Sequence, residues 1–186
     1  MQKLKLYKNP EGLRGRGAMT VQLWWLVQAT LFRLSPQFLY GWRRCILRAF
    51  GAKIGKRVII RPTVKVTYPW KLSIEDDVWI GDDVVLYTLD EIKIKRNSVV
   101  SQRSYICTGT HDYLAEDFAM VTLPVFLGEG VWLATDVFVA PGVKVGDNCV
   151  VGARSSVFKD LAPDYIYHGS PALPVKRRPF CASASS

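Results

Sequence analysis

The feature that most restricts the fold is a six-residue period in the C-terminal half of the chain. Between residues 127 and 161 an aliphatic residue returns at every sixth position, and a small or aliphatic residue follows each one four positions later. The first series is Leu127, Leu133, Val139, Val145, Val151 and Val157, and the second is Val131, Val137, Val143, Cys149, Ser155 and Leu161. This period fits neither a 3.6-residue helix nor a long alternating strand. It is typical of a parallel β-helix built from hexapeptide repeats.

The same period is present upstream, but it is interrupted. Two extra residues separate each group of three aliphatic positions from the next, and a longer insertion precedes Leu127. The groups are Ile54, Ile60 and Val66, then Ile74, Ile80 and Leu86, then Ile94, Val100 and Ile106. If three repeats make one triangular coil of about 18 residues, every insertion falls at the same corner. Loops on a rigid scaffold are where function concentrates, so this corner is the predicted functional edge.

The rest of the chain is organised around this coil. The opening residues, rich in Gly, indicate an extended or mobile arm over residues 1–18, without the pattern of a signal peptide. Three parts are predicted: an N-terminal arm and amphipathic helical cap at 1–50, the β-helix at 51–162 with an inserted loop at 107–126, and a C-terminal closure with a basic tail at 163–186. Within the last part, Cys181–Ser186 are predicted to be disordered.

Two helices are predicted in the cap. One runs from Val21, capped by Thr20, to about Leu34, and the other runs from Pro36 to about Phe50. The second has an apolar face, with Arg43, Arg44 and Arg48 largely opposite to it. The first is too short and too interrupted by polar residues to span a bilayer.

Two functions of the cap remain open, and they are compatible. The helices can cover the open end of the solenoid or contact another subunit, because a solenoid needs capping. They can also rest on an anionic membrane surface through residues 20–50, since they are aromatic, amphipathic and basic.

Charge and cysteine content exclude several classes. Residues 1–61 hold 13 Lys and Arg against one Glu, whereas residues 62–186 hold 12 against 15 Asp and Glu. The repeat region has no basic stripe interleaved with aromatics, so no nucleic-acid partner is predicted. An apolar fraction of 49% excludes a disordered chain. Four cysteines without a C-x-x-C pair indicate a reduced, cytoplasmic protein with neither a disulfide framework nor a zinc site.

The longest insertion contains one of the two histidines in the chain, His111. Its surroundings are polar and include Gly109, so the side chain is not at an inward position of the coil. The unperturbed pKa of imidazole suits proton abstraction near neutrality. A structural histidine is the alternative, because a lone histidine is more often structural than catalytic.

The chain resembles the left-handed β-helix hexapeptide acyltransferases, and among them the colanic-acid-biosynthesis type of sugar O-acetyltransferase. The resemblance extends over about residues 20–178, and its left-handed coil is an implication of the family. The hexapeptides specify the fold more than the activity, whereas the His-Asp-Tyr loop and the N-terminal block are more specific. The matching segments are Leu34-Ser-Pro to Gly41-Trp-Arg-Arg, Phe50-Gly-Ala-Lys-Ile-Gly, Tyr68-Pro-Trp, Cys107-Thr-Gly-Thr-His-Asp-Tyr, Gly130-Val-Trp, Val139-Ala-Pro-Gly-Val, Gly152-Ala-Arg and Lys159-Asp.

This resemblance implies an all-β fold with a helical cap and an acetyl-CoA-dependent O-acetyltransferase. The acetyl group would pass to a sugar hydroxyl in exopolysaccharide or surface-polysaccharide biosynthesis, in a cleft between subunits of a homotrimer, without a metal. His111 matches the family's catalytic base. Thr135 matches the position whose backbone amide stabilises the oxyanion.

Other positions are assigned by the same resemblance. Trp132, Ala134 and Ala153 match positions that line the pantetheine arm of CoA. Lys159 and Lys176 match basic positions that meet the CoA phosphates, with a solvated surface lysine as the alternative for each.

The predicted acceptor contacts are Asp112 and Tyr113, beside the catalytic histidine, and Thr88. The last of these replaces an Asn found in many relatives, and its hydroxyl can still donate or accept. Leu173 stands where an Arg is common near the CoA adenine, and His168 is predicted to be structural.

Several alternatives remain open. A non-catalytic β-helix scaffold or binding module and a sugar N-acetyltransferase share the repeat. A β-helix carbonic anhydrase would need three histidine ligands for zinc, and the chain has only two histidines. Covalent catalysis through Cys107 is a minor variant. The acceptor is an exopolysaccharide subunit, a lipid-linked sugar or a free saccharide.

Overall fold

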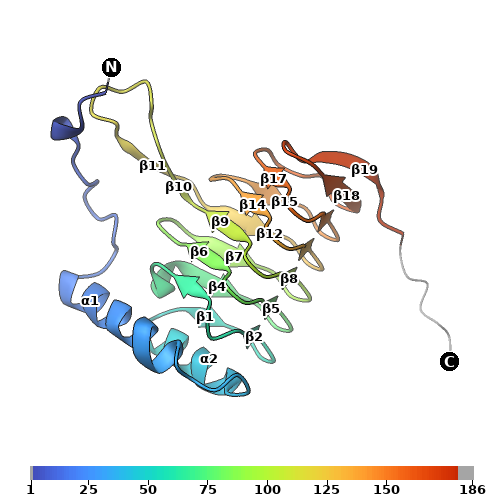
Figure 1. The fold of residues 1–186 in the computed structure, drawn as a ribbon, viewed down its shortest axis with the longest axis horizontal. Coiled ribbons are helices and arrows are strands. Elements are labelled where there is room, and N and C mark those ends of the chain that lie inside the picture. Colours follow the sequence, from blue (N-terminus) through green and yellow to red (C-terminus); the bar gives the residue numbers. More distant parts are fainter. Residues whose placement is uncertain (1, 180–186) are drawn as a thin grey trace.

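The computed structural model describes residues 2–179, and its main body is a stack of coils wound from three parallel sheets (Figure 1). Sheet A has the order β1-β4-β7-β12-β15, sheet B the order β19-β18-β16-β13-β8-β5-β2, and sheet C the order β17-β14-β9-β6-β3. From β1 to β9 and from β12 to β17, successive strands belong to successive sheets, so that three strands make one turn of the coil. The predicted β-helix with an N-terminal helical cap is confirmed.

The strands are short, as a six-residue repeat requires. Those of sheet A are β1 (Lys53–Ile54), β4 (Leu72–Ile74), β7 (Ile92–Ile94), β12 (Val125–Leu127) and β15 (Lys144–Val145). Those of sheet B are β2 (Ile59–Ile60), β5 (Trp79–Ile80), β8 (Val99–Val100), β13 (Trp132–Leu133), β16 (Val150–Val151), β18 (Tyr165–His168) and β19 (Leu173–Arg177). Those of sheet C are β3 (Lys65–Val66), β6 (Val85–Tyr87), β9 (Tyr105–Cys107), β14 (Phe138–Val139) and β17 (Ser156–Val157).

The six-residue positions stack directly upon one another inside the coil. Ile60 pairs with Ile80, Ile80 with Val100, Val100 with Leu133, and Leu133 with Val151. All five side chains are buried, and each contributes about 2 kcal/mol of hydrophobic free energy. The preceding residue of each strand points outward, because successive side chains of a strand alternate between its two faces.

The insertions gather at a single corner, as their spacing predicts. Each lies where the chain passes from sheet C to sheet A, and we call this the insertion corner. Its segments are residues 67–71 with the 3-10 helix η3 (Pro69–Lys71), residues 88–91, and residues 108–124, where β10 (Gly109–His111) pairs antiparallel with β11 (Met120–Thr122). The last of these is a hairpin that projects from the coil (Figure 1).

The corner between sheets B and C is compact by contrast, and we call it the plain corner. Its residues 81–83, 101–103, 134–136 and 152–154 stack as equivalent turns. Asp83, Arg103 and Asp136 all have positive φ, at 56°, 60° and 59°. The Arg103 guanidinium donates to both carboxylate oxygens of Asp136, at 2.7 and 2.8 Å.

The helical cap covers the N-terminal end of the coil (Figure 1). The first helix, α1 (Ala18–Val27), continues as the π-helical segment η2 (Gln28–Phe32). The buried Trp24 of α1 donates its indole N–H to the Val66 carbonyl at 2.8 Å. The second helix, α2 (Tyr40–Ala49), contacts β1 and β2.

Both helix starts differ from the sequence prediction. The predicted cap at Thr20 is wrong, because α1 already begins at Ala18 after the extended Gly17 and Thr20 lies within the first turn. The second helix begins at Tyr40, since residues 36–39 form a turn in which the Leu39 N–H bonds the Pro36 carbonyl.

Arg43 is also placed differently from the prediction of a polar face. It is fully buried, and its guanidinium donates to the carbonyls of Ile60, Pro36 and Gln37 and to the Ser35 hydroxyl, at 2.5–2.9 Å. Burial lowers its pKa. A hydropathy pattern assigns a basic side chain to the polar face of a helix, so it does not predict this burial. Through the Ile60 carbonyl, the Arg43 side chain joins the cap to the first coil.

The substitution Arg43→Met should destabilise the protein by about 3 kcal/mol, because the buried Ile60 carbonyl and the partly buried carbonyls of Pro36 and Gln37 would lose their donor. Chemical unfolding followed by circular dichroism would measure this change. The exposed Arg33→Met is the matched control and should stay within about 0.5 kcal/mol of the parent. Equal stability of the two variants would contradict the account.

The C-terminal end of the coil is closed by an antiparallel pair. Strand β19 pairs with β18 at the edge of sheet B, with Ile166 opposite Lys176. This pairing covers a strand edge that would otherwise be open. The predicted disordered segment Cys181–Ser186 lies outside the described residues. Within residues 2–179, none of the helices has the length and hydrophobicity needed to cross a membrane.

Candidate active site

His111 lies at the end of β10, on the hairpin of the insertion corner. Its Nδ1 is 2.8 Å from the Phe118 carbonyl oxygen, and its ring stacks on the Phe118 ring with centroids 4.1 Å apart and planes 8° apart. A carbonyl oxygen can only accept, so in this contact Nδ1 holds the proton. In the neutral ring Nε2 is then the basic nitrogen. The hairpin therefore presents a histidine of fixed orientation and fixed tautomer.

The N-terminal arm packs against this hairpin and against the rest of the insertion corner (Figure 1). The Lys3 amide donates to the Glu116 carbonyl at 2.7 Å, and the two side chains form an ion pair. The Tyr7 ring centroid is 5.8 Å from that of His111. The sequence prediction of an extended or mobile arm did not include this contact, since a stretch rich in Gly and Lys has no apolar period that signals packing.

Four residues predicted to hold CoA lie together on the outer side of sheet B and at the plain corner. Trp132 is on β13, Ala134 and Thr135 follow it, and Ala153 follows the neighbouring strand β16. Register pairs Trp132 with Val150, and the Arg154 amide donates to the Thr135 carbonyl at 2.9 Å. Trp132 is 46% exposed.

The Thr135 amide makes no hydrogen bond within the part of the chain that the structure describes. Its side-chain hydroxyl donates to the Gln102 carbonyl at 3.0 Å, which fixes the turn. An N–H held in place without a partner is the kind of group that can bind a developing oxyanion.

Within one chain, His111 and Thr135 are at different corners. The width of sheet C separates these corners, roughly 15–20 Å for five or six extended residues. Lys159 follows β17 and is exposed on the same side as His111. Lys176 is exposed on β19, at the edge of sheet B. The predicted residues therefore form two groups, one at the insertion corner and one on sheet B.

The three predicted acceptor contacts have different environments. Asp112 and Tyr113 are exposed at the hairpin, and an Asp112 carboxylate oxygen accepts from the Leu114 amide at 2.9 Å. Thr88 is fully buried, and its hydroxyl accepts from the Tyr68 amide at 2.7 Å and donates to the Tyr68 carbonyl at 3.0 Å. In this chain the Thr88 side chain has no exposed surface with which to contact a sugar.

Three further residues named in the sequence predictions are His168, Cys107 and Leu173. His168 lies so close to Gly152 that a Cβ at position 152 would be 2.5 Å from the imidazole Cδ2. Cys107 is buried, and burial raises the pKa of its thiol, which disfavours the nucleophilic thiolate. Leu173 is 61% exposed on β19. No group of three or more metal-ligating side chains occurs among residues 2–179.

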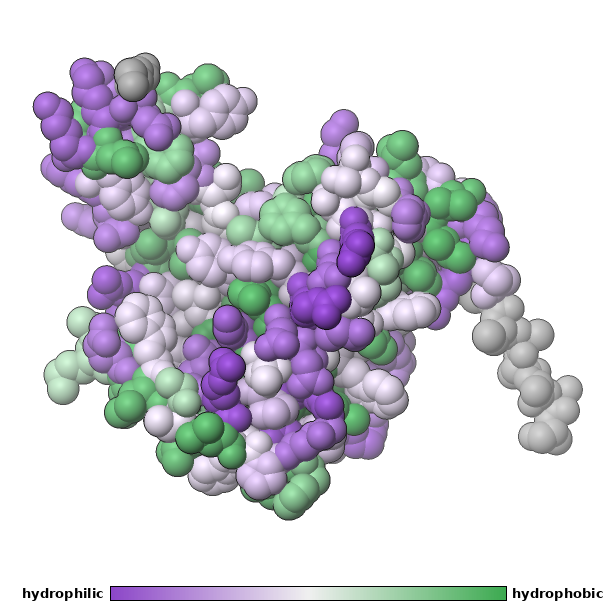
Figure 2. Space-filling view, viewed as in Figure 1, coloured by the Kyte–Doolittle hydropathy of each residue, from purple (hydrophilic) through white to green (hydrophobic). Residues whose placement is uncertain are grey.

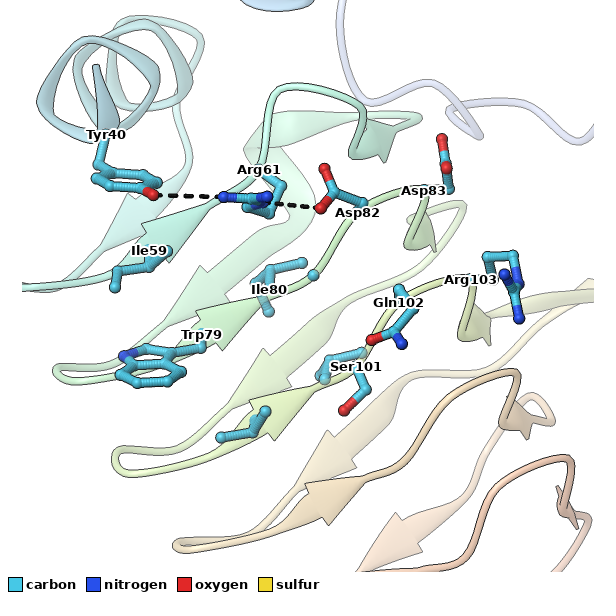
Figure 3. A pocket seen from close by; sticks show the side chains of 13 residues that line it. Tyr40, Ile59, Arg61, Trp79, Ile80, Asp82, Asp83, Ser101, Gln102 and Arg103 are labelled. Carbon is cyan, nitrogen blue, oxygen red and sulfur yellow. Dashed lines mark hydrogen bonds and ion pairs between the residues drawn. The ribbon is translucent and has the colours of Figure 1, made fainter. Parts of the chain in front are cut away.

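A groove on the outer side of sheet B was not predicted from the sequence. It has a volume of about 610 Å³ and lies over β2, β5 and β8, with Tyr40 of α2 at one end (Figure 3). Trp79 is its most exposed aromatic side chain, at 56%. Outward positions of a two-residue strand have no period of their own, so nothing in the sequence distinguishes this stretch of the sheet.

Comparison with known proteins agrees with this geometry. A family model described as bacterial transferase hexapeptide (six repeats) matches residues 124–159. WcaF of Escherichia coli (strain K12), a protein named as a colanic acid biosynthesis acetyltransferase, is 58% identical over 178 residues, which are 96% of this chain and 98% of WcaF. A maltose O-acetyltransferase from Clostridium difficile 630 superposes with a TM-score of 0.80 at 25% identity, covering 94% of this chain and 92% of that one.

A hexapeptide-repeat acetyltransferase from Vibrio cholerae, solved in complex with acetyl coenzyme A, has a TM-score of 0.78. At 22% identity over 91% of this chain and 89% of that one, this likeness concerns the fold. The stacked repeats and the coil thus define the class of hexapeptide-repeat transferases. Because the identity with WcaF extends over nearly the whole of both chains, the chain belongs to the hexapeptide-repeat acetyltransferase family that includes WcaF.

Proposed function

We propose that this acetyltransferase moves the acetyl group of acetyl-CoA to a sugar hydroxyl, in the biosynthesis of an exopolysaccharide or surface polysaccharide. The observation that supports it most is the hydrogen bond from His111 Nδ1 to the Phe118 carbonyl, since it leaves Nε2 as the base. The name of the maltose O-acetyltransferase supports the choice of a sugar and of oxygen rather than nitrogen, and the name of WcaF supports acetyl transfer in polysaccharide biosynthesis. Nothing in the contacts of the hairpin favours a purely structural scaffold.

The proposed reaction is direct transfer. His111 Nε2 takes the proton of the acceptor hydroxyl as its oxygen attacks the thioester carbonyl. The Thr135 amide donates a hydrogen bond to the resulting oxyanion. Collapse of the tetrahedral intermediate breaks the carbon–sulfur bond, and the imidazolium returns the proton to the departing CoA sulfur. Cys107 takes no part, because its thiol is buried and burial raises its pKa, which disfavours the thiolate.

The two groups of residues can meet if the site is shared between copies of the chain. The hairpin of one subunit would bring His111, Asp112 and Tyr113 to the sheet B side of its neighbour, which holds Trp132 and Thr135. A cyclic homotrimer repeats this heterologous contact three times and closes it. In this arrangement Ala134 and Ala153 line the pantetheine arm, and Lys159 and Lys176 lie near the CoA phosphates.

Replacing His111 by Ala should lower kcat for acetyl transfer by about 10²–10⁴-fold, because the general base is lost. The KM for acetyl-CoA should change little, since the histidine acts on the acceptor hydroxyl. A thioester-cleavage assay with a panel of free, lipid-linked and nucleotide-linked sugars would measure both. Cys107→Ser is the control and should retain activity. Undiminished transfer by the His111→Ala protein would refute the mechanism.

We also propose that the cap touches the surface of an anionic membrane. Large apolar side chains of α1 and the segment after it are exposed, including Leu23 at 53%, Leu26 at 61% and Leu34 at 76%. Hydrophobic side chains reach the surface over α1 and α2, at the lower left of Figure 2. A surface helix that is apolar on its outer face needs a cover, and the adjacent basic arm suits anionic lipid.

The double substitution Leu23→Glu and Leu26→Glu should strongly reduce co-sedimentation with anionic liposomes, because it removes apolar area and adds like charge. Circular dichroism should show an unchanged fold, since neither side chain is buried. Neutral phosphatidylcholine liposomes should bind less of the parent protein than anionic liposomes do. Val175→Glu changes an exposed side chain at the far end of the coil, and this variant should bind anionic liposomes as the parent does. Equal binding by the double variant would show that the cap has no membrane role.

A further inference from the structure

The groove on sheet B is a continuation of the surface on which the CoA residues lie. Trp132 donates its indole N–H to the Ser101 hydroxyl at 3.0 Å, and Ser101 lines the groove. The coil of Thr135 lies directly above the coil of Gln102, whose carbonyl accepts from both Thr135 and Asp136. The groove therefore begins one coil below the proposed oxyanion site and extends away from the CoA residues, toward the cap.

The side chains of the groove offer an aromatic platform near the neutral side chains of Ser101 and Gln102, with charged side chains at the border. The indole of Trp79 is exposed on the outer face, with the amide of Gln102 on the next coil (Figure 3). Two arginines border the groove, but both are already paired. Arg61 lies 2.8 Å from Asp82 and Arg103 lies 2.7 Å from Asp136. The Arg61 guanidinium also contacts the Tyr40 hydroxyl, at 3.5 Å.

The arrangement of charges in the groove favours a neutral ligand over an anionic one. The two arginines that could bind a phosphate group are already paired with carboxylates, and the Asp83 side chain adds a further negative charge to the lining. A neutral, hydroxyl-rich ring has no such conflict. Its apolar face can lie on the indole, while its hydroxyls exchange hydrogen bonds with Gln102 and with the paired charges.

We propose that the sheet B groove binds a neutral saccharide segment of the acceptor, so that the enzyme acetylates an oligosaccharide in preference to a single sugar. This inference rests on the proposed function, because it places the reacting hydroxyl beside Thr135. Trp79 lies two coils away from there, roughly 10 Å along the stack, and three residue positions back along the strand direction. One pyranose ring is too short to occupy both places, and a chain of sugar units follows the groove.

The experiment compares saccharides of different length. Binding of glucose and maltotriose is measured by ligand-observed saturation-transfer NMR, and acetyl transfer to each is measured with acetyl-CoA. Wild type should bind maltotriose more tightly than glucose. Trp79→Ala should weaken maltotriose binding about tenfold, the size of one lost aromatic stacking contact, and should bring the ratio of the two affinities close to one. Trp79→Phe, which keeps an aromatic ring, should restore most of the preference.

Trp25→Ala is the matched control, because Trp25 is 45% exposed and lies on α1 outside the groove. Its preference for maltotriose should equal that of wild type. An unchanged preference in Trp79→Ala, an equal loss for glucose and maltotriose, or no binding of maltotriose by wild type would each overturn the inference. The proposed function fails separately, if wild type transfers acetyl to none of the free, lipid-linked and nucleotide-linked sugars of the panel although Trp79→Ala loses the binding preference.

Discussion

The rest of the molecule depends on the in-register stacking of aliphatic side chains inside the coil. Each inward position must meet its equivalent one coil away, as Ile80 meets Val100 and Val100 meets Leu133. A slip of one residue in a strand would turn every inward side chain outward, so the register is strongly specified. Because all insertions are confined to one corner, a segment of 17 residues at 108–124 adds the hairpin that carries the proposed base without disturbing any of the three sheets.

Because the coil is regular, the proposed catalytic groups lie at its corners and outside its packed interior. The coil provides a rigid surface with a Thr135 amide that makes no hydrogen bond among residues 2–179, and the hairpin provides an imidazole whose tautomer is set by the Phe118 carbonyl. The two lie at different corners of one chain, so the proposed mechanism needs two copies of the chain. Assembly of copies around a symmetry axis is then part of the proposed catalytic device, because it brings the base of one subunit to the oxyanion site of the next.

The sequence predicts the coil well because its signal is repeated at every turn. The six-residue period identifies the inward residues and the corner of the insertions, and a resemblance to the family identifies His111. What it misses depends on contacts between distant segments. The arm that brings Tyr7 to His111 and the buried Arg43 arise from packing of parts that share no period. The groove around Trp79 lies on outward positions of sheet B, which have no period of their own. Thr88 shows a limit of the resemblance. The resemblance predicts that it contacts the acceptor, yet its side chain is fully buried and already hydrogen-bonded to Tyr68.

The most direct test of a shared site is complementation between two inactive variants. His111→Ala removes the base from one group, and Ala153→Trp blocks the pantetheine surface of the other without touching the inward core. Each variant alone should be nearly inactive. Co-assembled in equal amounts into mixed trimers, they should regain about a quarter of wild-type activity, because a quarter of neighbouring pairs join an intact hairpin to an intact sheet B surface. Mixed trimers that remain as inactive as either variant would contradict the shared site.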